Sequence, residues 1–247
     1  MNIIVPMAHL DENFDAAEYM YPKPLIEVNG KPLVEYVIDN LQKIEGVENI
    51  YFILKEGICS KFHLDNTITL LCNKAKIIYL KNDTSGSVCS ILMAIDQINQ
   101  KKECIIVNAD QIFLTDLNEI INNFKINKFD GAVITFSSVH PRWSYALVID
   151  NQVVQFAEKN PISKNAIAGF YYFKTFELFV INAFNTIVDD DNLNGNFYTS
   201  SVLNQLILSG KNVSHSAINN NNYFSLFSPQ KIKEFETYLN KNNANIK

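Results

Sequence analysis

The sequence predicts an α/β fold in which a mixed, mostly parallel sheet is flanked by helices and carries a small antiparallel extension. In the first half of the chain, short apolar segments alternate with segments whose apolar residues recur every three or four positions. This strand–helix–strand order is typical of parallel sheets with right-handed crossovers. In the second half, several β-branched and aromatic segments follow one another closely, which indicates antiparallel strands.

The first half is expected to contain strands at Asn2–Pro6, Asn49–Leu54, Lys76–Leu80 and Cys104–Val107. The last of these, CIIV, is almost wholly apolar, as in a strand that helices cover on both faces. Two helices are expected between the strands. The segment KPLVEYVIDNLQKI places its apolar residues on one helical face, and Gly86–Ile98 has the same spacing.

The second half is expected to contain four longer strands and three helices. The strands are Ala132–Phe136, Tyr145–Ile149, Val153–Ala157 and Ala166–Phe173, with a turn at Asp150-Asn151 and a further short strand near Val213. The helices are Phe176–Ile187, Tyr198–Leu208 and a terminal helix that starts at Ser228-Pro229, where proline suits the first turn. Asn219–Asn222 is expected to be a loop.

Composition excludes several classes of protein. With 247 residues, 47% hydrophobic and 19% charged, the chain has the profile of one globular domain over residues 1–247. A net charge of −5 without a basic tract argues against nucleic acid or an anionic membrane as partner. The start, MNIIVPMAHLDENF, lacks the basic region of a signal peptide, and the four cysteines lack metal spacing. We therefore expect a cytoplasmic protein with buried free thiols.

Candidate functional residues follow the expected strands, because open parallel sheets bind ligands beyond the carboxyl ends of their strands. Asp110 follows the CIIV strand, where a carboxylate can hold a hard divalent cation; the alternatives are a helix N-cap and a turn aspartate. Lys23 lies between Pro22 and Pro24, which stiffen its backbone and suit a phosphate clamp, although a solvated loop lysine fits equally.

Two further candidates have plain structural alternatives. Glu158 and Lys159 end a strand and could bind a ligand or form a surface ion pair of little energetic value. Gly86, in TSGSV, could let the backbone approach a flat base or could serve a turn. No serine has the G-x-S-x-G context of a hydrolase, and no histidine has a partner at catalytic spacing.

Taken together, these segments resemble the sugar-nucleotidyltransferase (nucleoside-diphosphate-sugar pyrophosphorylase) family, in its small bacterial branch. The resemblance runs from Asn2 to about Val213 in family order. It is carried by IIVPMA, YPKPLIEVNGKPLVEYVIDNL, TSGSVCSILMAID, IIVNADQ, HPRWSYALVID, VVQFAEKNPIS, AIAGFYYFK and GNFYTSSVLNQLILSGKNV. It implies a GT-A type, Rossmann-like fold, with a nucleotide-binding half at about 1–127 and a substrate-binding half at about 128–247.

The resemblance also implies roles for individual residues. It implies catalytic roles for Lys23 on the phosphates and for Asp110, which would hold Mg²⁺. It implies nucleotide binding by Ala8, His9, Lys23, Gly86 and Asn108, and binding of the phosphorylated substrate by Tyr145, Glu158, Lys159 and Gly169. The implied reaction joins a nucleoside triphosphate to a sugar 1-phosphate or similar metabolite and releases pyrophosphate, for capsule or lipopolysaccharide synthesis. The sequence leaves a homo-oligomer open.

The chain departs from the family pattern in the loop after the first strand. Where relatives carry A-G-x-G-S-R-F, a loop that cradles the triphosphate, this chain has Ala8 followed by HLDENF. Two carboxylates therefore stand where phosphates would bind, and a carboxylate repels phosphate unless a cation intervenes. A second departure lies in GNFYTSS, where more distant relatives show a second metal carboxylate near Ser200. Two other functions stay open: an impaired relative that binds nucleotide sugars, and a GT-A glycosyltransferase.

Overall fold

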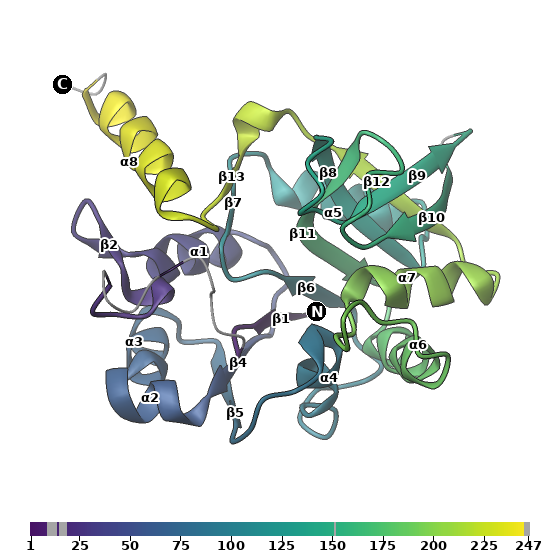
Figure 1. The fold of residues 1–247 in the computed structure, drawn as a ribbon, viewed down its shortest axis with the longest axis horizontal. Helices are drawn as coiled ribbons and strands as arrows, with labels where there is room; N and C mark the ends of the chain where they lie inside the picture. Colours follow the sequence, from purple (N-terminus) through teal and green to yellow (C-terminus); the bar gives the residue numbers. More distant parts are fainter. Residues whose placement is uncertain (9–13, 15–18, 151, 245–247) are drawn as a thin grey trace.

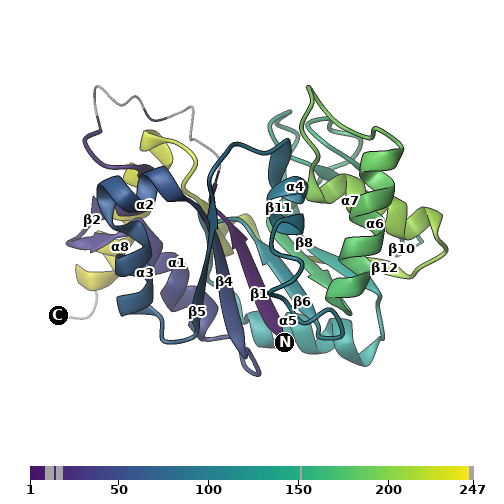
Figure 2. The same ribbon diagram turned by 90° about the horizontal axis from the view of Figure 1, so that it is seen from below.

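The computed structural model describes residues 1–8, 14, 19–150 and 152–244. A central mixed sheet runs through both halves of the chain, with the path β10-β9-β11-β6-β1-β4-β5. β8 pairs with β11 and also with β12. Helices cover both faces of this sheet (Figure 1; Figure 2).

The first half supplies the parallel part of the sheet. β1 (Asn2–Pro6) lies between β4 (Asn49–Lys55) and β6 (Cys104–Val107), and β5 (Ala75–Leu80) pairs with β4; all these pairs are parallel. Their carboxyl ends therefore share one edge of the sheet. Val5 and the CIIV residues are fully buried, as the apolar run in each strand predicts.

The second half joins this sheet through one antiparallel strand. β11 (Asn165–Phe173) pairs antiparallel with β8 (Gly131–Ser137) along one side. Along its other side it pairs antiparallel with β6 through Phe170–Phe173 and with the start of β9 (Tyr145–Ile149) through Ala166. β10 (Gln152–Ala157) forms a hairpin with β9. β12 (Val213–Ala217) pairs with β8 as a parallel strand.

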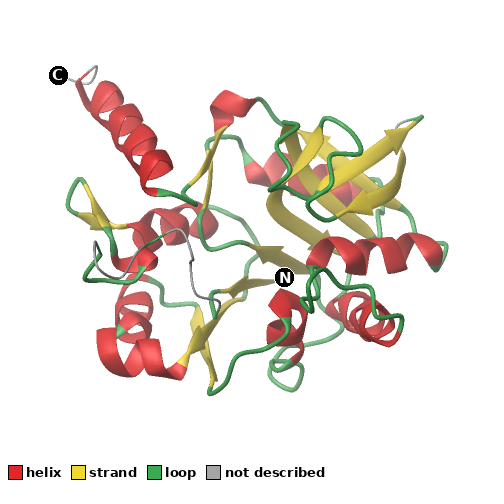
Figure 3. Ribbon diagram, viewed as in Figure 1, coloured by secondary structure: helices red, strands yellow, loops and turns green. Residues whose placement is uncertain are grey.

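The helices divide between the two faces of the sheet (Figure 3). One core contains side chains from α1 (Leu33–Gln42), α2 (Glu56–Phe62), α3 (Leu64–Leu71) and α5 (Leu117–Ile126). The core on the other face contains side chains from α4 (Gly86–Leu92), α6 (Phe176–Val188) and α7 (Thr199–Leu208). Among the described residues, no helix combines the length and the apolar character needed to cross a membrane.

A smaller group of elements packs around α8 (Pro229–Ala244). It comprises the pair β7 (Gln111–Phe113) and β13 (Tyr223–Ser225) and the pair β2 (Glu27–Val28) and β3 (Lys31–Pro32). The 3₁₀ turn η1 (Lys23–Leu25) lies against α1, and η2 (Asn220–Asn222) lies next to β13. Phe235 of α8, Ile112 of β7 and Val28 of β2 share a third apolar core.

Most of the expected elements are present, with two corrections. The helix expected over Gly86–Ile98 ends at Leu92, because Ala94 and Ile95 donate to the carbonyls three residues back (3.0 and 3.2 Å), which tightens the chain into turns. The loop expected at Asn219–Asn222 contains η2, whose first turn is capped by the Asn219 side chain on the Asn221 N–H (2.9 Å). Of the turn expected at Asp150-Asn151, residue 151 lies outside the described residues.

The cysteines are free thiols, as expected from their spacing. Cys59, Cys72 and Cys104 are buried, whereas Cys89 is half-buried. Burial raises the pKa of the Cys104 thiol, so this side chain behaves as a small apolar group.

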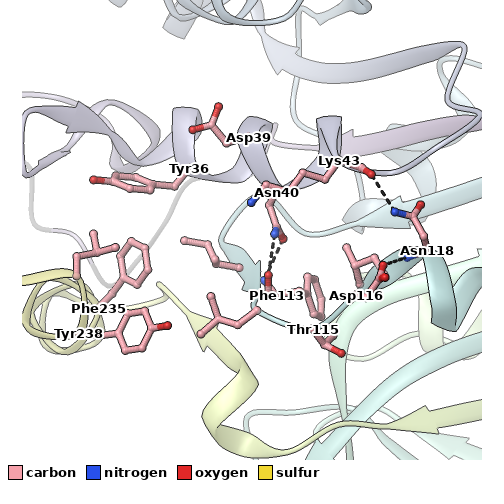
Figure 4. Close-up of a pocket in the computed structure, with 14 residues that line it drawn as sticks. Tyr36, Asp39, Asn40, Lys43, Phe113, Thr115, Asp116, Asn118, Phe235 and Tyr238 are labelled. Carbon is pink, nitrogen blue, oxygen red and sulfur yellow. Dashed lines mark hydrogen bonds between the residues drawn. The ribbon is translucent and has the colours of Figure 1, made fainter. Parts of the chain in front are cut away.

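A pocket of about 510 Å³ lies between α1, the loop after β7, and α8 (Figure 4). Two of its polar side chains, those of Asn40 and Asn118, bond to the backbone of neighbouring segments. Asn40 donates to the Phe113 carbonyl (2.7 Å) and accepts from the Phe113 N–H (2.9 Å), while Asn118 bonds to the backbone of Lys43 and Glu45. These bonds fasten α1 to β7 and α5, so we assign the pocket lining a structural role.

Asn40→Ala is expected to lower the free energy of unfolding by about 2–3 kcal/mol, because it leaves two buried backbone groups of Phe113 without partners. Chemical denaturation measures the change. Asn66→Ala, at an exposed position on α3, is the control and should stay within about 0.5 kcal/mol of the wild type. Equal stabilities for the two variants would contradict the structural role of Asn40.

Candidate active site

An ion pair between Lys23 and Asp110 forms the centre of the candidate site. Lys23 is the first residue of η1, and Asp110 follows β6 by three positions. Their Nζ and Oδ2 atoms are 2.9 Å apart, and the side chains are only 13% and 18% exposed. The sequence predicts both residues separately; the structure brings them together across 87 positions.

A pocket of about 490 Å³ opens beside this ion pair. Lys23, Asp110 and Asn108 line it, together with apolar and aromatic side chains that include Tyr21 of the loop before η1 and Phe62 of α2. Three of the predicted nucleotide- or metal-binding residues thus share one cavity at the carboxyl edge of the sheet.

Asp110 is fixed by further bonds. Gln111 Nε2 donates to Asp110 Oδ1 (2.8 Å), and the backbone N–H of Leu226 donates to the Asp110 carbonyl (2.8 Å). Gln111 starts β7, and Leu226 follows β13, the strand that pairs with β7. Asp110 is therefore held where three segments meet. It lies in the turn between β6 and β7, as one of the two structural alternatives expects, and it is not the N-cap of a helix.

Glu158 lies at the end of β10 and bonds to two serine hydroxyls. Ser144 and Ser200 both donate to its Oε2 atom, the latter at 2.7 Å. Burial raises the pKa of Glu158, while the two hydroxyls and the nearby Lys159 oppose this shift. Ser200, near which more distant relatives would carry a second metal carboxylate, here serves as a hydrogen-bond donor to Glu158.

Lys159 points to a different partner. Its backbone has a φ of 50°, and its Nζ donates to the Tyr198 hydroxyl at 3.2 Å, on an exposed part of the surface. Glu158 and Lys159 are adjacent in the sequence but bond to different residues. Glu158 accepts from Ser200, and Lys159 donates to Tyr198.

Gly169 and Asn108 are in contact. Gly169 has a φ of 69°, and a Cβ atom on it would lie 2.7 Å from Asn108 Nδ2 and 3.1 Å from Gln111 Cγ. The Gly169 carbonyl accepts from the Asn108 N–H (2.9 Å). Glycine is required here so that β11 can pass close to the residues that follow β6.

The other predicted residues are placed as follows. Tyr145 is buried, and its hydroxyl donates to the His140 carbonyl (2.7 Å). Ala8 is buried in the core shared with α4, and His9 lies outside the described residues. Gly86 has a φ of 91°, and a Cβ on it would lie 2.6 Å from the Phe197 backbone nitrogen, so its close approach is to the protein's own backbone.

The sheet places Glu158 at the same edge as Asp110. β11 runs against β6, with Phe170 opposite Val107, so its earlier residues lie beyond the end of β6. Tyr145 pairs with both Ala166 of β11 and Ala157 of β10. β9 therefore pairs with β11 just beyond the end of β6, and the end of β10 lies beside it, at the edge that holds Asp110.

The side chains around Asp110 fit a magnesium ion that takes most of its ligands from phosphate and water. Among the described residues, no three His, Cys, Asp or Glu side chains form a group that could enclose a metal. Mg²⁺, however, commonly binds proteins through one or two carboxylates and completes its shell with substrate phosphates and water. Asp110 offers one carboxylate beside a pocket that Lys23 also lines. This arrangement fits Mg²⁺ bound together with phosphate.

Comparison with known proteins identifies the family. The model of the nucleotidyl transferase family matches residues 19–220. The chain belongs to this family.

Two relatives show how the match is distributed. The bifunctional protein GlmU of Methanococcus aeolicus is 33% identical over 159 residues, which cover 62% of this chain and 35% of the relative. A bifunctional sugar-1-phosphate nucleotidylyltransferase/acetyltransferase of Sulfurisphaera tokodaii is 26% identical over 152 residues, covering 62% and 34%. The chain thus matches only about a third of the length of these nucleotidyltransferase relatives.

Solved structures confirm the fold. A nucleoside-diphosphate-sugar pyrophosphorylase from Vibrio cholerae matches with a TM-score of 0.82 at 22% identity, over 95% of this chain and 99% of the other. A UDP-glucose pyrophosphorylase in complex with UDP-glucose matches with a TM-score of 0.77 at 14% identity, over 98% of both chains. The mixed sheet flanked by helices is therefore the nucleotidyltransferase fold that the sequence predicts.

Sequence reasoning missed several residues that position the site. They are Gln111, which bonds to Asp110, the serines of Glu158, and Tyr198, which bonds to Lys159. The sequence offered a weak signal for three of them. Gln111 is adjacent to Asp110, and Tyr198 and Ser200 are polar residues of the matching segment GNFYTSS. Their partners could not be identified because each bond except that of Gln111 joins segments 14 to 42 positions apart.

Glu158→Gln is expected to change the pH dependence of stability. Because burial raises the pKa of Glu158 above its usual 4.5, the folded protein binds this proton more tightly than the unfolded chain. The wild type therefore loses stability as the pH rises from about 4.5 through the folded-state pKa, and the glutamine variant lacks this loss. The melting temperature of the variant, relative to the wild type, should rise between pH 4 and pH 7.

Scanning calorimetry across this pH range makes the measurement. Glu177→Gln, at an exposed position in the first turn of α6, is the control and should show no such trend. A Glu158→Gln difference that stays constant with pH would show that the carboxyl titrates alike in both states.

Proposed function

We propose that this chain transfers a nucleotidyl group from a nucleoside triphosphate to a sugar 1-phosphate or a similar phosphorylated metabolite, with release of pyrophosphate. The observation that carries the proposal is the Lys23–Asp110 pair, held at the carboxyl end of β6 beside a pocket. Family membership and the arrangement of Glu158 and Lys159 at the same edge support it.

The proposed reaction is an in-line displacement at the α-phosphorus. A phosphate oxygen of the acceptor forms a bond to this phosphorus, and the bond to the pyrophosphate oxygen breaks. The reaction needs no protein nucleophile, so the side chains contribute positioning and charge neutralisation. Lys23, which two flanking prolines hold in η1, would stabilise the negative charge that grows on the attacked phosphate.

Asp110 would hold Mg²⁺ against the phosphates. A divalent cation held there would neutralise charge on the phosphates. Lys23 and Asp110 neutralise each other in the structure, so a phosphate that engages Lys23 takes a cation away from Asp110. Asp110 would then be left with an uncompensated charge unless it held a divalent cation, so this pair of residues would favour a metal–nucleotide complex over the nucleotide alone.

Glu158 and Lys159 would bind the acceptor. A buried carboxylate with one oxygen bonded by two serines is a fixed acceptor for a hydroxyl group of a sugar. Lys159, at the exposed end of the same strand, would contact its phosphate. We extend the proposal to a cytoplasmic enzyme that supplies nucleotide sugars for capsule or lipopolysaccharide synthesis.

Two alternative functions follow from the loop after β1, which lacks the glycines and the arginine of the family pattern. Residues 9–13 of this loop lie outside the described part of the chain. An impaired relative would bind nucleotide sugars without making them. A glycosyltransferase would use a nucleotide sugar as donor and would need to bind only a diphosphate.

The deciding experiment incubates the protein and Mg²⁺ with each nucleoside triphosphate and a panel of sugar phosphates, and follows pyrophosphate release. We expect one pair to react and Asp110→Asn to lower its turnover at least about a hundredfold, the effect of losing one electrostatic contact in a transition state. Asp150→Asn, in the exposed β9–β10 turn, is the control. No reaction with any pair, combined with thermal stabilisation by nucleotide sugars alone, would favour the alternatives.

Lys159→Gln is expected to raise the KM for the phosphorylated acceptor about ten- to a hundredfold, because a charge-assisted contact to phosphate is lost. The KM for the nucleotide should change little. Glutamine removes the charge and keeps a polar side chain, and Lys164→Gln, on the same connection between β10 and β11, is the control. Equal losses for both substrates would indicate that Lys159 acts on the structure and not on the acceptor.

A further inference from the structure

A hydrogen-bonded chain of three side chains ends at Asp110. The Tyr223 hydroxyl donates to Gln111 Oε1, and Gln111 Nε2 donates to Asp110 Oδ1 (2.8 Å). Lys23 Nζ donates to the other carboxylate oxygen, Oδ2 (2.9 Å). Each carboxylate oxygen of Asp110 therefore accepts a bond from a side chain of a different segment.

The strand pairing of β7 and β13 creates this chain. Gln111 lies opposite Ser225 and Phe113 lies opposite Tyr223, so Gln111 and Tyr223 are diagonal neighbours on one face of the pair. Both are buried, with 3% and 8% of their surface exposed. The Tyr223 ring is fixed by Phe136 and Phe113, with ring centroids 4.8 and 5.5 Å away.

The chemistry of the three groups gives the chain a direction. An ionised carboxylate can only accept hydrogen bonds, so the amide nitrogen of Gln111 must face Asp110 and its oxygen must face away. Burial and the Asp110 charge raise the pKa of Tyr223 well above its ordinary value, so its hydroxyl keeps the proton that it donates to this oxygen. Tyr223 thus fixes the orientation of the amide, and the amide fixes the carboxylate.

The backbone of β11 departs from regular strand geometry beside Gln111. Gly169 is forced to a φ of 69°, and any Cβ there would lie 3.1 Å from Gln111 Cγ. The register of β11 against β8 shifts between Ile167 and Tyr171, around this glycine. The sheet is irregular at the point where the Gln111 side chain reaches Asp110, although a regular strand would form more bonds.

We propose that Gln111 and Tyr223 are positioning residues that hold the Asp110 carboxylate in the orientation in which it binds the metal of the proposed reaction. This inference rests on the proposed function, and it concerns residues that act through Asp110 without touching a substrate. It predicts that the two residues act in series: loss of the Tyr223 hydroxyl has its effect through Gln111.

A double-mutant cycle tests this order. Tyr223→Phe, Gln111→Met and the double variant keep the volume of the side chains and remove the polar links. Binding of Mn²⁺, in the presence of a nucleoside triphosphate or a nucleotide sugar, is measured by equilibrium dialysis, in which the Mn²⁺–nucleotide complex crosses the membrane and the excess of Mn²⁺ on the protein side reports the ion that the protein holds. We expect each single variant to weaken Mn²⁺ binding about tenfold, and the double variant to be no weaker than Gln111→Met alone.

Tyr172→Phe is the matched control. It also removes the hydroxyl of a buried tyrosine, bonded to Glu103 Oε1 at 3.1 Å, but at the far end of β11 from Asp110. It should lower the melting temperature without weakening Mn²⁺ binding. A loss of Mn²⁺ affinity equal to that of Tyr223→Phe would show that the effect is one of general stability and would overturn the proposal.

The outcomes separate this inference from the proposed function. If the wild type binds Mn²⁺ and the single variants bind it equally well, or if the two single effects simply add, the series of Tyr223 and Gln111 is wrong while the metal role of Asp110 stands. If the wild type binds no Mn²⁺ with any nucleotide, the metal role of Asp110 is wrong and the positioning role falls with it.

Discussion

The site depends on one antiparallel strand, β11, placed beside the parallel strand β6. Because β11 runs against β6, its first residues lie beyond the end of β6, where Asn108 and Asp110 follow. The same residues of β11 pair with β8 and with the start of β9, which brings the end of β10 to this edge. One reversal of strand direction thus delivers Glu158 to the edge that holds Asp110.

This arrangement makes Gly169 the most constrained residue of the strand. Its carbonyl accepts from Asn108, and its missing side chain leaves space for Asn108 and Gln111. A larger residue would push β11 away from β6 and move both groups. Glycine adopts the positive φ at this position without strain, and the register shift around it lets the strand accommodate the site.

The sequence predicts the elements of this fold better than their contacts. Strands with continuous apolar runs, such as CIIV, and helices with long periodic faces, such as α1, are expected where they occur. The short α2, α3 and β7 are not, because a few residues carry too little periodicity. Strand position and flanking prolines single out Asp110 and Lys23, but their pairing across 87 positions depends on the tertiary fold.

The same limit applies to the residues that support the site. Tyr223 lies 112 positions from Gln111, and its role depends on the register of β7 against β13, two strands of three residues each. A shift of one residue would turn Tyr223 to the opposite face. This register is set by the aromatic packing of Tyr223 with Phe113 and Phe136 and by the bond from Leu226 to the Asp110 carbonyl. The core of the protein and the geometry of its candidate metal ligand are therefore fixed by the same few contacts.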